Sequence, residues 1–328
     1  SSINWKEVSW WKILNSDENV LLLSSVEEYK QDIIDAKCKE LKNLQDNDVF
    51  QWVDDDGQET VSCKWVITEK EDNGKRVLKA RLVARGFEEK KPGRTDSPTC
   101  SRQALRMVFV TASMMGWNLS SLDIRSAFLQ GNEILRDVYV RPPEEFAEEG
   151  KIWKLFRCLY GLNDAPREWY NRIEKVLGDL GAKKSLYDGA LFLWHKDNQL
   201  YGILVTHVDD FIYCGCKEWK TSVIDQLLKI FKISSMENGS FKYIGLNIVK
   251  TDNEVFVDQD RYVESLREID LPRERLLHKD AVLNETEKKQ LRSLSGQLLW
   301  VTSQTRPDCS YDSCRVSNYG KAPTVRNI

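Results

Sequence analysis

The chain has 328 residues, of which 41% are hydrophobic and 30% charged, and this balance is ordinary for a soluble globular protein and excludes a disordered or fibrous chain. No apolar run approaches the roughly 20 residues of a membrane span, and the first residues lack the basic-then-apolar pattern of a signal peptide. The net charge of −3 disfavours a nucleic-acid binder, but residues 64–106 hold twelve Lys and Arg against six Asp and Glu, so a basic stripe is compatible with the composition.

The first half of the chain predicts two helices, a hairpin and a strand. Residues 26–47 carry apolar residues at helical spacing between charged ones, which indicates a surface helix. Two β-rich runs, at 62–70 and 76–87, are joined by the turn-rich sequence EDNGK and predict a hairpin. Residues 102–115 predict a well-packed helix that ends at a glycine, and residues 117–124 predict a strand that enters the core.

The second half predicts a long helix followed by a sheet. Residues 167–181 are amphipathic and stop at a glycine. Three apolar runs separated by turns follow at 190–195, 201–208 and 211–215, and the order of these elements predicts an α+β fold with helices packed on one face of a small antiparallel sheet. Beyond them the pattern predicts a helix at 223–231, a strand at 241–250, a strand and then a helix at 255–269, and mostly helix in about the last sixty residues.

The cysteines and histidines do not form a recognisable metal or redox motif. The eight cysteines are scattered, and the only close pair, Cys214 and Cys216, has neither zinc-finger nor redox-motif spacing. None of the three histidines lies near a cysteine pair, so a His/Cys metal site is not expected. We expect free thiols.

Acidic residues meet apolar strands at two places. Asp123 closes the strand LDI, and Asp209 and Asp210 lie between two apolar runs, at the expected tip of a hairpin. Two-metal phosphoryl transfer uses such carboxylates to hold two Mg²⁺ ions about 3.5–4 Å apart. An Asp-Asp pair at a β-turn is more often only a turn, so these residues alone leave both interpretations open.

An ordered series of motifs resembles the reverse transcriptase of copia-type retrotransposon polyproteins over nearly the whole chain. The motifs are CKWVITEK, LKARLVARGF, LDIRSAFLQG, VYVRPPEEF, KLFRCLYGLNDAPREWY, VDD, FKYIGLNI, DQDRYVESL, SGQLLW and TRPDCSYD. The resemblance implies a right-hand polymerase with palm, fingers and thumb, in which the palm is an antiparallel sheet with packed helices. It also implies an RNA- and DNA-templated DNA polymerase that uses deoxynucleoside triphosphates.

The resemblance assigns the metal site residue by residue. Asp123 matches the first palm aspartate of the family, and the backbone carbonyl of Ile124 matches a further magnesium ligand. Asp209 matches the metal-bridging aspartate of the catalytic hairpin and Asp210 a weaker, supporting one. The implied cofactor is a pair of Mg²⁺ ions, for which Mn²⁺ is an alternative.

Substrate contacts are assigned in the same way. Lys79 and Arg81 are two apart in a strand and therefore share a face, where both can meet the triphosphate, and Lys70 on the partner strand can join them. Phe128 matches the aromatic residue that lies beneath the sugar and excludes a 2′-hydroxyl. The alternatives are a solvated face of a hairpin for the cations and an ordinary core aromatic for Phe128.

Two more segments match family motifs. Tyr160 and Gly161 match the segment that packs on the incoming nucleotide, although turn formation would also explain the glycine. The residues that match the primer-grip hairpin are Phe241, Tyr243, Ile244 and Gly245, and an ordinary amphipathic strand is the alternative.

The chain departs from the family pattern at several positions. His207 stands where a tyrosine is usual, and Asn163-Asp164 stands where a basic residue and glutamine are common. The stretch GFEEKKPGRTDSPTC is shorter and less typical than the family's loop. The chain ends soon after TRPDCSYD, where family members continue into ribonuclease H, and no protease or integrase signature is present, so we expect an excised domain or a gene that kept only the polymerase.

The expected domains are an N-terminal helical extension (1–48), fingers with the entry to the palm (49–121), the palm (122–252, with a fingers segment at about 137–168), and the thumb with the start of a connection (253–328). Expected partners are an RNA or DNA template with its primer and nucleotides, and no membrane. The cytoplasm is the expected location, with particles and the nucleus as alternatives. The rival functions are a domesticated, non-polymerising protein that binds nucleic acid or a partner, and a metal-dependent nuclease.

Overall fold

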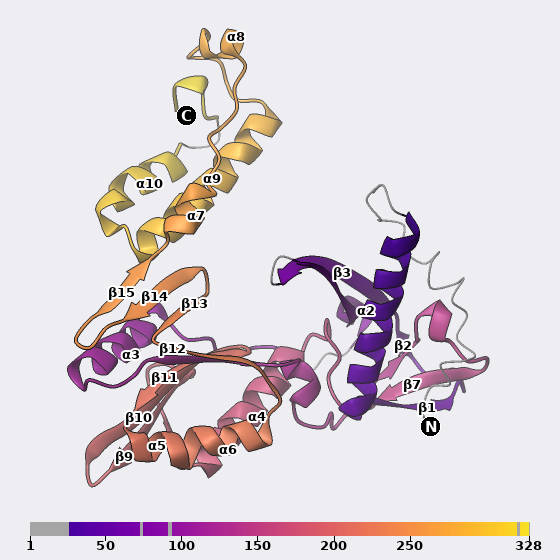
Figure 1. Cartoon of the computed structure of the whole chain (residues 1–328). Helices are drawn as coiled ribbons and strands as arrows, with labels where there is room; N and C mark the ends of the chain where they lie inside the picture. Colours follow the sequence, from indigo (N-terminus) through magenta and orange to yellow (C-terminus); the bar gives the residue numbers. More distant parts are fainter. Residues whose placement is uncertain (1–25, 73–74, 91–93, 320–321, 328) are drawn as a thin grey trace. The chain divides into compact units, whose positions relative to one another are not determined.

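The computed structural model describes residues 26–72, 75–90, 94–319 and 322–327, and the chain divides into two compact units (Figure 1). Unit 1 holds the described residues up to Cys100 together with Asp123–Phe211 and Lys217–Ser235. Unit 2 holds Ser101–Leu122, Ile212–Cys216 and the described residues from Met236 onward. The candidate metal ligands all belong to unit 1.

The helices and strands follow the sequence patterns closely. The α-helices are α2 (Val26–Asp46), α3 (Arg102–Met114), α4 (Ala165–Asp179), α5 (Lys217–Trp219), α6 (Asp225–Ile230), α7 (Asp260–Glu264), α8 (Arg273–Leu276), α9 (Glu285–Gln304) and α10 (Ser310–Ser317). Short 3₁₀ turns are η1 (Gly86–Glu88), η2 (Ala127–Gln130), η3 (Glu144–Phe146), η5 (Pro307–Cys309) and η6 (Val325–Asn327), and η4 (Lys220–Ile224) is a π-helical turn. The strands are β1 (Phe50–Asp54), β2 (Thr60–Val61), β3 (Cys63–Asp72), β4 (Lys75–Ala84), β5 (Ser120–Ile124), β6 (Tyr139–Val140), β7 (Lys151–Leu155), β8 (Lys183–Lys184), β9 (Leu191–Lys196), β10 (Gln199–His207), β11 (Asp210–Gly215), β12 (Ile233–Asn238), β13 (Ser240–Tyr243), β14 (Leu246–Lys250) and β15 (Val255–Asp258).

The strands form four sheets, and helices and sheets together make the α+β fold that the sequence predicted. The largest sheet has the order β12-β5-β11-β10-β9-β8. Asp123 lies in β5, Asp210 begins β11, and Asp209 lies between β10 and β11. The others are β1-β7-β6-β2, the hairpin β3-β4 and the sheet β13-β14-β15. Two expectations were wrong in detail. The strand expected at 117–124 begins at Ser120, and the strand expected at 241–250 is a hairpin that turns at Ile244 and Gly245.

Helix α2 is part of the core of unit 1 and not only a surface helix. Its apolar face, including Leu41 and Leu44 at 0% exposure, packs with Leu82 of β4 in one hydrophobic cluster. Lys37 is also fully buried, and its Nζ lies 3.2 Å from Glu145. The helical spacing predicted the helix, but the buried ion pair depends on a residue 108 positions away and could not be predicted locally.

Two further findings concern the described residues. All eight cysteines are free thiols. No helix within the described ranges is both long and apolar enough to cross a membrane.

Candidate active site

The two acidic segments lie side by side in the large sheet. Strand β10 ends at His207 and β11 begins at Asp210, so the connecting turn consists of Val208 and Asp209. The backbone N–H of Ile124 donates to the Asp209 carbonyl at 2.9 Å, which ties this turn to β5 beside Asp123. We expected both aspartates of the pair at the hairpin tip. Only Asp209 lies in the turn, and Asp210 is the first residue of the next strand.

The three carboxylates act on one another electrostatically. Burial, followed by the negative charges of Asp209 and Asp123, raises the pKa of Asp210 from 3.8 to about 6. Burial also raises the pKa of Asp209, and the charge of Asp123 adds to this effect, while Arg81 and His207 oppose it. Such half-buried carboxylates gain from a hard cation, because Mg²⁺ prefers oxygen ligands.

The carboxylates fit Mg²⁺ as partial ligands and do not form a complete metal cage. Within the described residues, no three His, Cys, Asp or Glu side chains are gathered closely enough to hold a metal ion by themselves. Mg²⁺ usually binds one or two carboxylates and completes its shell with water and substrate phosphates. The carboxylate oxygens of Asp123, Asp209 and Asp210, whose charges act on one another, suit that mode of binding.

Ser234 is a neighbour of this site that the sequence did not reveal. Its hydroxyl donates to the Asp123 Oδ2 atom, and it also lies 3.4 Å from the Asp123 carbonyl oxygen. The residue belongs to β12, 111 positions from Asp123. No local pattern marks it, because the contact exists only through the pairing of β12 with β5 in the sheet.

His207 remains uncharged more readily than an ordinary histidine. Burial lowers its pKa, and the nearby Asp209 charge opposes this. Its Nδ1 atom is buried and has no hydrogen-bond partner among the described residues. The departure from the family's usual tyrosine therefore places an imidazole beside the turn.

Phe128 lies one short turn after Asp123. Ser126 adopts a left-handed conformation, with φ of 51°, and starts the turn η2 that carries Phe128. The ring of Phe128 is half-buried, and its centroid lies 5.6 Å from that of Tyr160 at an angle of 60°. The Asn43 side chain of α2 donates to the Ser126 hydroxyl at 3.0 Å and supports the turn. The two aromatic rings assigned to the substrate thus contact each other.

Tyr160 and Gly161 are fixed against the end of β4. The Ala84 N–H donates to the Tyr160 carbonyl at 2.7 Å. Gly161 has φ of +88°, and a Cβ there would lie 2.2 Å from the Ala84 carbonyl oxygen. The glycine is therefore required by both its conformation and this close approach. The Arg81 guanidinium lies 5.9 Å from the Tyr160 ring centroid.

The register of the β3–β4 hairpin puts Lys79 and Arg81 on one face. Lys70 pairs with Val77, Lys79 with Thr68 and Arg81 with Val66, so the cations alternate with residues that face the other way. The side chain of Lys70 lies outside what the structure describes. On the opposite face, Leu82 is fully buried against the core.

Glu40 of α2 lies beside these cations, and sequence reasoning missed it. Its side chain is buried, and its Oε1 atom has no hydrogen-bond partner among the described residues. Burial raises its pKa, while a hydrogen bond from Asn43 and the charges of Arg81 and Lys79 oppose the shift. An acidic group therefore shares the neighbourhood of the cations assigned to the triphosphate.

The departure at Asn163-Asp164 is accommodated structurally. Asn163 donates to the Gly86 carbonyl at 2.7 Å. Asp164 is 4% exposed and accepts from the Arg136 guanidinium, with Nε at 3.0 Å and Nη2 at 2.8 Å from Oδ2. Arg136 also donates to Glu89 at 2.6 Å. Both side chains thus serve packing and charge pairing within unit 1.

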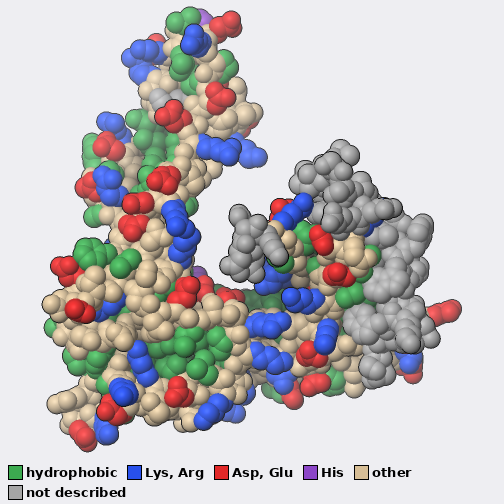
Figure 2. Space-filling view, viewed as in Figure 1, with side chains coloured by type: hydrophobic (Ala, Val, Ile, Leu, Met, Phe, Trp, Pro, Cys, Tyr) green, Lys and Arg blue, Asp and Glu red, His purple; other side chains and the backbone are tan. Residues whose placement is uncertain are grey.

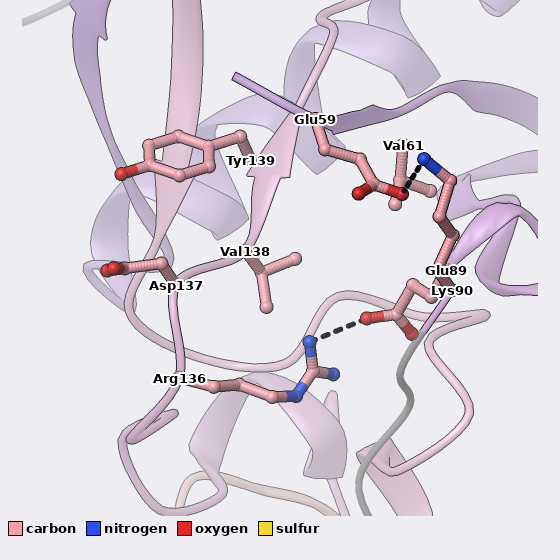
Figure 3. Close-up of a pocket in the computed structure, with 8 residues that line it drawn as sticks. All are labelled: Glu59, Val61, Glu89, Lys90, Arg136, Asp137, Val138 and Tyr139. Atoms are coloured by element: carbon pink, nitrogen blue, oxygen red, sulfur yellow. Dashed lines mark hydrogen bonds and ion pairs between the residues drawn. The ribbon is translucent and has the colours of Figure 1, made fainter.

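Figure 3 shows the Arg136–Glu89 contact in the wall of a pocket of about 410 Å³. Residues from β2, β6 and the segments next to η1 line it, and the Lys90 Nζ atom lies 3.3 Å from Glu59 across it. None of the residues predicted from the sequence lines this pocket. The carboxylates of Asp123, Asp209 and Asp210 also lie in unit 1 but outside this pocket.

The primer-grip match belongs to unit 2. Phe241 and Tyr243 are 6% and 3% exposed, so their side chains face the core of that unit. Ile244 and Gly245 both have positive φ, of 47° and 75°, which is the geometry of a tight two-residue hairpin turn. The two aromatic rings are therefore buried, whereas Ile244 and Gly245 in the turn are more exposed.

Comparisons with known proteins show the family to which the chain belongs. A family model described as Reverse transcriptase (RNA-dependent DNA polymerase) matches residues 47–272. The Retrovirus-related Pol polyprotein from transposon RE1 of Arabidopsis thaliana is 28% identical over 293 residues, 82% of this chain and 19% of that protein. The corresponding polyprotein from transposon TNT 1-94 of Nicotiana tabacum is 28% identical over 251 residues, 73% of this chain and 19% of that protein. The chain therefore spans about a fifth of the length of these relatives.

Solved structures show the fold. The foamy viral protease-reverse transcriptase in complex with dsDNA covers 89% of this chain and 53% of its own, with a TM-score of 0.51 and 12% identity. A second foamy viral structure, with ds DNA, covers 95% of this chain and 48% of its own, with a TM-score of 0.51 and 11% identity. The α+β polymerase fold and the resemblance to retrotransposon polyproteins are confirmed, and the chain belongs to the reverse transcriptase (RNA-dependent DNA polymerase) family.

Proposed function

We propose that the chain is an RNA- and DNA-templated DNA polymerase that adds deoxynucleotides to a primer by two-metal nucleotidyl transfer. One observation carries the proposal. The Asp123 strand and the Asp209 turn are joined by the hydrogen bond from the Ile124 N–H, and the charges of Asp123 and Asp209 act on Asp210. A structural Asp-Asp turn would not need a third carboxylate from another strand.

The carboxylates of Asp123, Asp209 and Asp210 and the carbonyl of Ile124 would hold the two ions. When bound, Mg²⁺ activates the attacking primer hydroxyl and stabilises the leaving oxygen. Asp210 would act as the weaker ligand, because its raised pKa leaves it partly protonated near pH 6. When a cation binds Asp123, the Ser234 hydroxyl would either give up its hydrogen bond to the Asp123 carboxylate or keep it beside the cation.

The residues assigned to the nucleotide substrate belong to unit 1, as the three carboxylates do. Lys79 and Arg81 share the face of the β3–β4 hairpin that the triphosphate would approach. Phe128, held against Tyr160, would lie beneath the sugar and leave no room for a 2′-hydroxyl. Figure 2 shows Lys and Arg side chains gathered over unit 1 between α4 and the lower end of α2, which supports binding to phosphate backbones despite the net charge of −3.

Primer extension tests the proposal. Asp209→Asn should abolish extension of a labelled primer on an RNA or DNA template, while primer–template binding and folding persist. The matched control is Asp197→Asn. Asp197 is exposed in the turn at the other end of β10 and has φ of 51°, which asparagine tolerates well. Full extension by Asp209→Asn would refute the metal site. Tight binding without any extension by the unmutated chain would favour the non-polymerising alternative, and degradation of the substrate would favour a nuclease.

A further inference from the structure

The turn that carries Asp209 contains a residue in an unfavourable conformation. Val208 has φ of +60°. This left-handed region is uncommon for any residue with a side chain, and a β-branched side chain is a genuine outlier there. A turn with this geometry persists only when its surroundings hold it.

A buried side chain binds the carbonyl oxygen of Val208. The indole Nε1–H of Trp169 donates to the Val208 carbonyl at 2.7 Å. Trp169 belongs to α4, is 1% exposed, and packs edge-on against Phe231 with ring centroids 5.3 Å apart. The next carbonyl, that of Asp209, accepts from the Ile124 N–H at 2.9 Å. Both carbonyls of the two-residue turn are therefore bound from two different elements.

The hydrogen bond from Trp169 has a direct effect on the position of Asp209. The Val208 carbonyl and the nitrogen and Cα of Asp209 lie in one rigid peptide plane. Fixing the carbonyl oxygen fixes the orientation of that plane, and with it the point from which the Asp209 side chain leaves the backbone. Metal ligands need this kind of support, because small displacements of a ligand weaken the site.

We propose that Trp169 is a positioning residue that holds the Val208–Asp209 peptide, and through it the Asp209 carboxylate, in place for the divalent metal ion. This inference rests on the proposed function of Asp209. Its second basis is the strained turn itself, which would relax if the indole donor were lost.

Two substitutions separate the hydrogen bond from packing. Trp169→Phe keeps a large ring but removes the donor. Trp169→His fills less space, yet its Nε2–H can occupy the place of the indole Nε1–H. If Trp169 acts through its donor, kcat should be higher in Trp169→His than in Trp169→Phe. Thermal stability should follow the opposite order, because the smaller ring leaves the larger cavity.

Trp194→Phe is the matched control. Trp194 is 4% exposed, packs edge-on against Trp219 at 5.1 Å, and donates its indole N–H to the Leu180 carbonyl at 2.9 Å, away from the catalytic turn. We expect Trp169→Phe to lower kcat at least tenfold with the nucleotide KM changed less than threefold. The control should lose similar thermal stability and keep kcat within about threefold of the parent.

Readouts without catalysis make the outcome independent of polymerase activity. In Trp169→Phe, the Ile124 amide should exchange hydrogen faster, and Mn²⁺ measured by electron paramagnetic resonance should bind at least fivefold more weakly than in Trp194→Phe. If the parent extends no primer, the proposed function fails, while faster exchange at Ile124 would still support the positioning role. Equal exchange or equal Mn²⁺ affinity in Trp169→Phe and Trp194→Phe would overturn it. With an active parent, equal kcat in these two variants would overturn it as well, as would a lower kcat in Trp169→His than in Trp169→Phe.

Discussion

Neutralising Asp210 should stabilise the metal-free protein. Burial and the charges of Asp209 and Asp123 raise the pKa of Asp210 from 3.8 to about 6. A raised acid pKa means that the folded state binds the proton more tightly than the unfolded state does. The stability from this group is therefore fully present below about pH 3.8 and is lost as the pH rises through about 6. Asp210→Asn removes the ionisable carboxyl, so the variant does not lose this stability as the pH rises.

The size of the effect follows from the shift. Each tenfold change in proton affinity is worth about 1.4 kcal/mol, so a pKa raised from 3.8 to about 6 sets an upper limit of roughly 3 kcal/mol at neutral pH. Solvent screening of a half-buried group reduces this to about 1–2 kcal/mol. In a chain of this length, such a gain raises the melting temperature by a few degrees.

Thermal unfolding in a chelator between pH 4 and pH 8 measures the gain. The melting temperature of Asp210→Asn should exceed that of the parent by the largest margin at pH 7–8, and the margin should shrink toward zero near pH 4. Asp197→Asn, on the exposed turn at the other end of β10, is the matched control for the substitution itself. A gain of the same size at every pH, or none at pH 7.5, would refute the electrostatic coupling of the three carboxylates.

Three other substitutions test the core and the candidate site of unit 1. Lys37→Met leaves the buried Glu145 carboxylate without its cation and should cost about 3–5 kcal/mol in the free energy of unfolding, measured by urea denaturation; a cost below about 1 kcal/mol would show that the pair contributes little. Glu40→Gln removes a negative charge beside Arg81 and should lower the nucleotide KM by about threefold; steady-state kinetics measures this, and an unchanged KM would show that Glu40 does not act on the nucleotide site. Phe128→Val should raise the ratio of kcat/KM for ribonucleotides over deoxynucleotides by on the order of tenfold, because relief of overpacking is worth about 1–3 kcal/mol; an active variant with an unchanged ratio would make Phe128 a core aromatic.

The elements of the fold were predictable because their signals are local. Apolar alternation and the EDNGK turn gave the β3–β4 hairpin, whose pairing runs from Cys63 with Ala84 to Asp72 with Lys75. Helix α3 ends beside Gly116, which has φ of +62°, as the pattern indicated. The hairpin at Ile244 and Gly245 was harder to predict, because its turn lacks the usual asparagine or aspartate before the glycine.

Part of the candidate site could be predicted and part could not. Asp123 and Asp209 stand beside apolar runs and in family motifs, so the sequence identifies them. Glu40, Ser234 and Trp169 carry no local signal, because their partners lie far along the chain; Trp169, for example, is 39 positions from Val208. Helix and strand periodicity predicts which face of an element is buried but does not predict which distant group it meets.

Template-directed incorporation of one nucleotide tests the central claim most directly. The parent chain would be mixed with Mg²⁺, all four deoxynucleoside triphosphates and four primer–templates that differ only in the first unpaired template base, for both RNA and DNA templates. The proposed polymerase predicts that the added nucleotide follows the template base in every case and that Asp123→Asn and Asp209→Asn add none. Addition that ignores the template, or equal addition by the asparagine variants, would contradict it.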